Sequence, residues 1–124
     1  MSPARQAYVN AVVNNYLRLP GTPLRASRSD RQLAVSLHNR GVPLRVVWAA
    51  FVIAGVRWAV RSPQQRKLQQ IRTLYYFLPA IDEVLATSPD PDYVHYLAAK
   101  LRPIVAEKER LLDSSGPTGA AGAR

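Results

Sequence analysis

The amino-acid sequence predicts an all-α protein: a single compact bundle of about five helices with a disordered C-terminal tail. Apolar residues recur at helical spacing through most of the chain, and no segment has the alternation typical of a strand. Prolines and isolated glycines separate these segments. The chain has 124 residues, 48% of them hydrophobic, which is enough for one core. We therefore expect one helical basic domain over residues 1–112 and a disordered tail over 113–124, where apolar periodicity is absent.

The first half of the chain contains three predicted helices, at residues 4–19, about 30–40 and about 44–60. Ser29 and Gln32 have the spacing of a capping box at the start of the second helix, and Gly41 suits the left-handed position after its end. The third helix is apolar on nearly every side, so other helices must surround it. We expect it to be the core element, with Trp48 and Trp58 buried.

The second half of the chain contains two predicted helices after a loop. Residues 62–70 (SPQQRKLQQ) are polar and basic, which predicts a loop that is flexible or is ordered by a partner. Thr73 is suited to cap a fourth helix that ends at Ala86, with a kink where Pro79 interrupts it. A fifth helix is expected over about 92–112, and it should also kink at its internal proline.

The net charge of +9 is distributed unevenly along the chain. Between Met1 and Ile81, twelve basic residues stand against one acidic residue, Asp30, which gives a charge of +11. Residues 82–124 contain five basic and seven acidic residues, a charge of −2. Eleven of the twelve basic residues are arginines, whose planar guanidinium pairs bidentately with phosphate. This pattern favours a partner of opposite charge, and the alternative is an arginine-rich proteome of high GC content.

The sequence lacks the features of several protein classes. It contains no cysteine, which rules out disulfides and thiolate zinc sites, so the cytoplasm is the expected location. The longest apolar run, residues 46–56, is too short for a membrane span of about 20 residues, and we expect no export signal. His38 and His95 lie on different predicted helices without a metal-binding pattern. Asp82 and Glu83 are neighbours and point to different sides of a helix. We expect no metal, no cofactor, no membrane association and no enzymatic activity.

The candidate binding residues are mostly arginines. The predicted second and third helices, joined by a turn at Gly41, resemble a helix-turn-helix unit, whose second helix reads bases in the major groove. That helix has almost no polar side here, so we reject direct base reading and expect contacts to phosphates. Tyr76 is expected to face outward for base stacking, whereas Tyr75 and Phe77 are expected in the core. The candidate residues are Arg25, Arg28, Arg31, Arg57, Arg61, Arg66, Lys67, Arg72 and Tyr76.

Two segments carry a resemblance to known proteins: GVPLRVV at residues 41–47 and IRTLYYFLPAIDE at residues 71–83. They resemble a small helical module of bacterial proteins from a mobile-element or replication-initiation context. More distantly, they are similar to the DnaD-like C-terminal domain of replication-restart proteins. The resemblance covers about Asp30 to Glu83, and Thr73 stands where the pattern has serine. It implies DNA binding near a helix with paired aromatics, and the residues that match are Arg72, Tyr75, Tyr76 and Phe77.

These observations lead to two hypotheses. The first is a nucleic-acid-binding accessory protein in replication, transposition or defence, which binds the phosphate backbone or single strands and favours DNA over RNA. The alternative is a helical assembly subunit of a larger ribonucleoprotein or protein complex, such as the small subunit of a CRISPR complex, with its basic face as the interface. An assembly subunit should expose a contiguous apolar patch in addition to a basic one.

Overall fold

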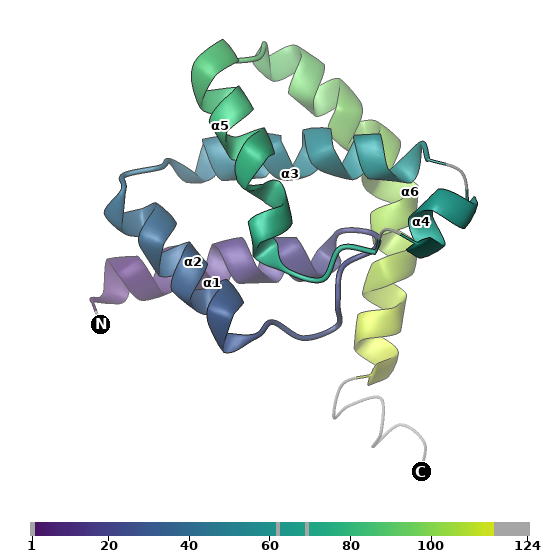
Figure 1. Ribbon diagram of the computed structural model, residues 1–124, viewed down its shortest axis with the longest axis horizontal. Helices are drawn as coiled ribbons and strands as arrows, with labels where there is room; N and C mark the ends of the chain where they lie inside the picture. The colour runs from purple at the N-terminus through teal and green to yellow at the C-terminus, as the bar shows by residue number, and fades with distance from the viewer. Residues whose placement is uncertain (1, 62, 69, 116–124) are drawn as a thin grey trace.

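The computed structural model describes residues 2–61, 63–68 and 70–115, and in these ranges it consists of helices and connections without a strand (Figure 1). The predicted all-α fold class is therefore confirmed. There are six α-helices and one 3-10 turn in the described ranges: α1 (Pro3–Arg18), α2 (Arg28–Asn39), α3 (Leu44–Ala59), α4 (Pro63–Leu68), η1 (Leu74–Phe77), α5 (Leu78–Thr87) and α6 (Pro91–Ser115).

Helix α3 is the central element, as its composition predicts, and it packs against α1, α5, α6 and η1. Its residues Val47, Ala50 and Phe51 are buried, and the ring of Phe51 contacts the fully buried Phe77 of η1. Trp58 is buried as expected. Trp48 is only half-buried, contrary to expectation, because its ring lies at the edge of the core against His95 of α6.

The capping box of α2 lies two residues earlier than the sequence suggests. The hydroxyl of Ser27 accepts a hydrogen bond from the backbone N–H of Asp30 (3.1 Å), and the carboxylate of Asp30 accepts one from the N–H of Ser27 (2.9 Å). The predicted pair of Ser29 and Gln32 is therefore wrong, because aspartate can serve at the third helical position where glutamate or glutamine is usual. Gly41 has a φ of +73°, which confirms the expected left-handed residue after α2.

The predicted loop at residues 62–70 contains a short helix, α4. Pro63 occupies its first position, where the missing N–H costs nothing. The guanidinium of Arg66 donates hydrogen bonds to the carbonyl oxygens of Ala59 and Arg61, at 2.9 Å each. Because these carbonyls lie at the end of α3 and lack helical partners, Arg66 fixes α4 against α3 and orders a segment that sequence polarity alone predicts as a loop.

The last two helices follow the predicted order with changed boundaries. Thr73 accepts a hydrogen bond from the N–H of Tyr75 and begins a 3-10 turn, and Pro79 then lies in the first turn of α5 instead of kinking a longer helix. Helix α6 contains Pro103 and changes direction along its length (Figure 1). It extends to Ser115, three residues beyond its expected end, and the rest of the expected tail, 116–124, lies outside the described residues.

Candidate nucleic-acid interface

The connection between α1 and α2 is held against the segment that precedes η1. Gly21 accepts a hydrogen bond at its carbonyl oxygen from the N–H of Ile71 (3.1 Å). The backbone of Gly21 has a φ of +80° and lies against the indole ring of Trp58, so closely that a Cβ there would come within 2.4 Å of the ring atom Cζ2. Only glycine combines this conformation with this close approach. Residues 21–23 and 70–72, about fifty positions apart, are thereby placed side by side.

A buried lysine fixes the same connection from the other side. The ammonium of Lys108 donates hydrogen bonds to the carbonyl oxygens of Leu19 (2.9 Å) and Thr22 (2.8 Å) and to the hydroxyl of Thr22 (2.9 Å). The side chain of Lys108 is 8% exposed, and burial lowers its pKa to about 8. Sequence reasoning missed this residue, since Lys108 stands between two glutamates on a helix that has the composition of a solvated surface.

A second link joins the start of α2 to the start of η1. Asp30 is 1% exposed, and its second carboxylate oxygen accepts a hydrogen bond from the N–H of Leu74 (2.9 Å). Its negative charge adds to the effect of burial in raising the pKa of the Tyr16 phenol. The one acidic residue in the first 81 positions is therefore turned into the protein and contributes no exposed carboxylate to the surface.

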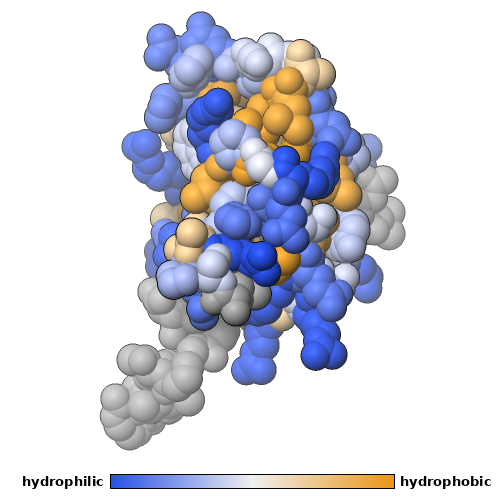
Figure 2. All heavy atoms as spheres, turned by 90° about the vertical axis from the view of Figure 1, so that its left-hand side faces the viewer, coloured by the Kyte–Doolittle hydropathy of each residue, from blue (hydrophilic) through white to orange (hydrophobic). Residues whose placement is uncertain are grey.

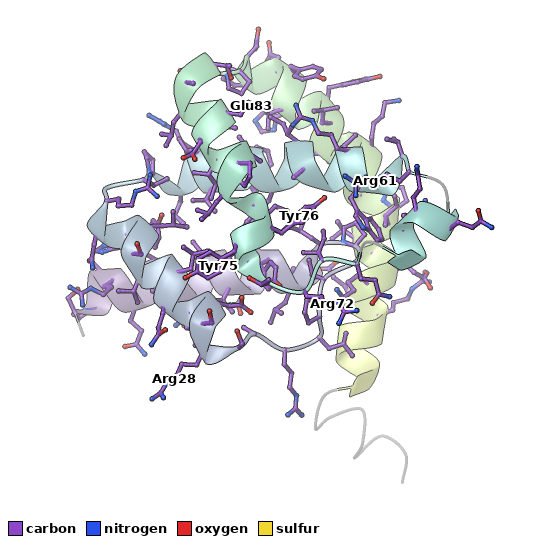
Figure 3. All side chains as sticks on the ribbon, in the orientation of Figure 1. Arg28, Arg61, Arg72, Tyr75, Tyr76 and Glu83 are labelled. Atoms are coloured by element: carbon purple, nitrogen blue, oxygen red, sulfur yellow. The ribbon has the colours of Figure 1, made fainter. Side chains whose placement is uncertain are left out.

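These two links bring four exposed arginines onto neighbouring segments. Arg25 lies in the connection before α2, Arg28 and Arg31 lie in its first turns, and Arg72 lies between Ile71 and the start of η1. None of the four has an ion pair or a side-chain hydrogen bond to any part of the chain that the structure describes. In Figure 3, Arg28 projects at the lower left of the view, and Arg72 lies to its right and higher, below Tyr76.

The aromatic residues of η1 are arranged differently from the prediction. A 3-10 turn has three residues per turn, so Leu74 and Phe77 share its inward side and are fully buried. Tyr75 consequently faces solvent, with 48% of its surface exposed. Tyr76 is half-buried, and its ring packs on Phe77 with a centroid distance of 5.1 Å. The outward tyrosine is Tyr75 and not Tyr76, whereas the buried position of Phe77 agrees with the prediction.

We call the surface formed by Arg25, Arg28, Arg31, Arg72 and Tyr75 the connector face. Three of its arginines come from the α1–α2 connection and the start of α2, and the other two residues come from residues 72–75. It combines unpaired guanidinium groups with an exposed aromatic ring, and these are the two kinds of group that contact the phosphates and bases of nucleic acids.

The remaining basic candidates do not lie together on this face. Arg57 forms a bidentate ion pair with Glu83 of α5, with N–O distances of 3.1 and 2.7 Å. Its guanidinium is thus already engaged, and these hydrogen bonds lower the pKa of the Glu83 carboxyl. Arg66 is engaged at the end of α3, and its guanidinium also lies 5.8 Å from the centre of the Trp58 ring. Both guanidinium groups thus have partners within the protein, and neither residue belongs to the connector face.

The last two basic candidates are Arg61 and Lys67. Arg61 follows the end of α3, is half-buried, and lies well above Arg72 in the view of Figure 3. It is a neighbour of α4 and not a member of the connector face. The side chain of Lys67 lies outside the described residues.

Carboxylates and histidines are dispersed over the described surface. A carboxylate oxygen of Asp82 lies 3.9 Å from a guanidinium nitrogen of Arg40, whereas the neighbouring Glu83 pairs with Arg57. The two carboxylates therefore point in different directions, as predicted. In the part of the chain that the structure describes, no three His, Asp or Glu side chains are placed to hold a metal ion. Among the same residues, no helix has the length and apolar character needed to cross a membrane.

Comparison with known proteins gives no further guide to this site. No protein-family model, no curated protein and no solved structure matches the chain. The resemblance to the DnaD-like domain therefore stays a prediction, and the case for a function depends on the residues of the connector face.

Proposed function

We propose that the protein binds nucleic acid at the connector face, mainly through backbone phosphates and with little reading of base sequence. Arg25, Arg28, Arg31 and Arg72 would contact phosphates, and Tyr75 would stack on an unpaired base. Such a protein is suited to an accessory role in replication, transposition or defence, and we favour DNA over RNA as its ligand.

The observation that carries the proposal is the contrast between paired and unpaired arginines. Arg18, Arg40 and Arg57 each have a carboxylate partner from α5 or α6. The four arginines of the connector face have none among the described residues, and Asp30, the one acidic residue in the first 81 positions, is buried. Positive charges on one surface without a counter-charge repel one another, and an anionic ligand removes that cost.

The packing of α3 supports phosphate contact over base reading. In a helix-turn-helix unit the second helix must enter the major groove with an exposed polar side. Helix α3 is buried along most of its length and contacts other helices on several sides. The exposed groups of the connector face lie instead on a connection, a helix start and a 3-10 turn.

The experiment that tests the proposal is a titration of the chain against duplex DNA, single-stranded DNA and RNA, followed by fluorescence anisotropy of the labelled strand. For about four phosphate contacts, affinity should fall roughly a hundredfold between about 50 and 200 mM salt, because each contact releases condensed counterions. Absence of binding at the lower salt concentration, or an affinity that does not depend on salt, would contradict the proposal.

A second candidate function is the helical assembly subunit. The observation that favours it is an apolar groove lined by Trp48. None of the connector-face residues lines this groove. An assembly subunit and a nucleic-acid binder are compatible, since the two surfaces are made of different residues.

A further inference from the structure

A hollow of about 510 Å³ lies between the start of α3, the end of α5 and the start of α6. Most of its lining is apolar and includes Val46, Trp48, Ala49, Val84, Leu85 and Val94. Leu85 is 45% exposed, and the adjoining Leu44 is 42% exposed. Figure 2 views the side where α3 starts and α5 ends, and it shows apolar residues reaching the surface in the upper half, bordered by hydrophilic ones.

Trp48 also lines a second hollow, of about 250 Å³, between α1, α3 and α6, together with Phe51, Val52 and Leu101. We call the two hollows together the Trp48 groove. Along α3 its lining extends from Pro43 to Val52, which is about 14 Å at the helical rise of about 1.5 Å per residue. Two or three turns of a partner helix match that length, and apolar side chains at i, i+3 or i+4 and i+7 would reach both hollows.

The rim of the groove is positively charged. Arg45 borders the larger hollow and Arg102 the smaller one; both are exposed, and neither has an ion pair among the described residues. Arg18 and Glu109, also on the rim, neutralise each other at 3.5 Å. A second copy of this chain, with its net charge of +9, would bring further positive charge to this rim. Charge complementarity instead selects an acidic partner.

We propose that the Trp48 groove binds an amphipathic helix of an acidic partner protein, whose apolar side chains enter the two hollows while its carboxylates pair with Arg45 and Arg102. Tryptophan and arginine are the residues that most often dominate the free energy of such interfaces, and here the tryptophan lies between the two hollows. The inference concerns a protein ligand and does not depend on nucleic-acid binding at the connector face.

The test uses two synthetic helical peptides of about 15 residues, or roughly four turns. They have the same leucines at i, i+3, i+4 and i+7, and the flanking positions carry glutamate in one peptide and lysine in the other. Fluorescence anisotropy of each labelled peptide with the full chain should show the glutamate peptide binding at least about tenfold more tightly. Trp48 should report binding by a change in its fluorescence, which Trp48→Phe should remove while leaving that of Trp58.

Three variants make the test specific to the groove. Leu85→Glu should weaken binding of the glutamate peptide at least about tenfold, because it places a like charge in the larger hollow. Leu24→Glu, at an equally exposed leucine of the α1–α2 connection, is the matched control and should leave affinity unchanged. Arg45→Glu should shift the preference toward the lysine peptide. If circular dichroism shows that Leu85→Glu does not fold, Arg45→Glu is the variant that tests the proposal.

Several results would overturn the proposal. They are no binding of either peptide, equal affinity for both peptides, or an affinity that neither Leu85→Glu nor Arg45→Glu alters. Light scattering of the free chain provides the remaining result: a dimer that Leu85→Glu dissociates would assign the groove to a second copy of the chain and not to an acidic partner.

Discussion

The carboxylate of Asp30 accepts a hydrogen bond from the backbone N–H of Leu74, 44 positions later in the chain, at 2.9 Å. The same carboxylate caps α2 through Ser27, so it holds the start of α2 and the start of η1 together. Arg28, Arg31, Arg72 and Tyr75 all lie within three residues of one of these two positions. The geometry of the connector face therefore depends on a buried side chain that no ligand would touch.

Asp30→Asn should lower the free energy of unfolding by about 2–3 kcal/mol, because an amide has one acceptor oxygen and would turn its NH₂ toward one of the two backbone donors. Ser27→Ala should cost about 1 kcal/mol as the loss of a helix cap. Ser29→Ala is the control and should stay within about 0.5 kcal/mol, since Ser29 is exposed and does not cap the helix. Chemical denaturation measures all three, and equal effects of the two serine variants would contradict the observed cap.

Gly21→Ala should destabilise the fold by more than about 2 kcal/mol, because it combines a positive φ with a Cβ placed 2.4 Å from the Trp58 ring. Gly41→Ala is the matched comparison: its φ is also positive, at +73°, but no atom lies within 4 Å of the added Cβ. It should cost only about 1 kcal/mol. The difference between the two melting temperatures isolates the contact with Trp58, and similar values would show that the contact is unimportant.

Lys108 predicts a particular dependence of stability on pH. Burial lowers the pKa of Lys108 from its ordinary value of 10.5 to about 8 in the folded protein. Between these two pH values the lysine is mostly protonated in the unfolded chain and mostly neutral in the folded protein, so the unfolded chain binds more protons. The free energy of unfolding should therefore rise from pH 8 to pH 10, by about 2 kcal/mol. Above pH 10 the gain should diminish, because burial raises the pKa values of Tyr8 and Tyr16 and favours the unfolded chain as tyrosines ionise. Lys108→Met should remove the rise, and its persistence in that variant would assign it to another group.

Tyr75→Ala should weaken binding to single-stranded nucleic acid about tenfold, since stacking on an aromatic ring contributes about 1–3 kcal/mol per base. Binding to duplex should change less than about twofold, because paired bases are not available to the ring. Tyr75→Phe should keep the affinity for single strands. Tyr96→Ala, at an exposed tyrosine of α6, is the control. If Tyr75→Ala and Tyr96→Ala have the same effect, the stacking role of Tyr75 is wrong.

The fold could be predicted from the sequence where a pattern within a few residues determines it. The apolar composition of α3 predicts its central position, and Gly41 and Thr73 predict the end of one helix and the start of the next turn. Local patterns fail where a distant partner decides the outcome. Residues 62–68 are polar, yet Arg66 orders α4 by bonding to the end of α3.

The candidate site could be predicted only in part for the same reason. The excess of arginines is visible in the sequence, but their availability depends on which of them meets a carboxylate, and Arg57 meets Glu83 through the packing of α5 on α3. The choice between Tyr75 and Tyr76 depends on a 3-10 turn, whose period of three differs from the helical period assumed for the segment. Lys108 has no sequence signal, because its three acceptors lie 86 and 89 positions away.

The measurement that tests the central claim most directly compares two double variants of equal charge. Arg28→Gln with Arg72→Gln removes two unpaired arginines of the connector face, and Arg40→Gln with Arg57→Gln removes two that already have carboxylate partners. Both change the net charge by the same amount, so a general electrostatic attraction would be reduced equally in each.

Affinity for single-stranded and duplex DNA should be measured over a series of salt concentrations, with circular dichroism to verify folding. We predict that the connector-face variant binds more weakly by at least about tenfold and that its slope of log affinity against log salt is smaller by about 1.5 to 2, as expected for two lost phosphate contacts. The paired-arginine variant should bind nearly as the parent does. Equal losses in the two variants, or a larger loss in the paired-arginine variant, would contradict the assignment of the connector face as the nucleic-acid interface.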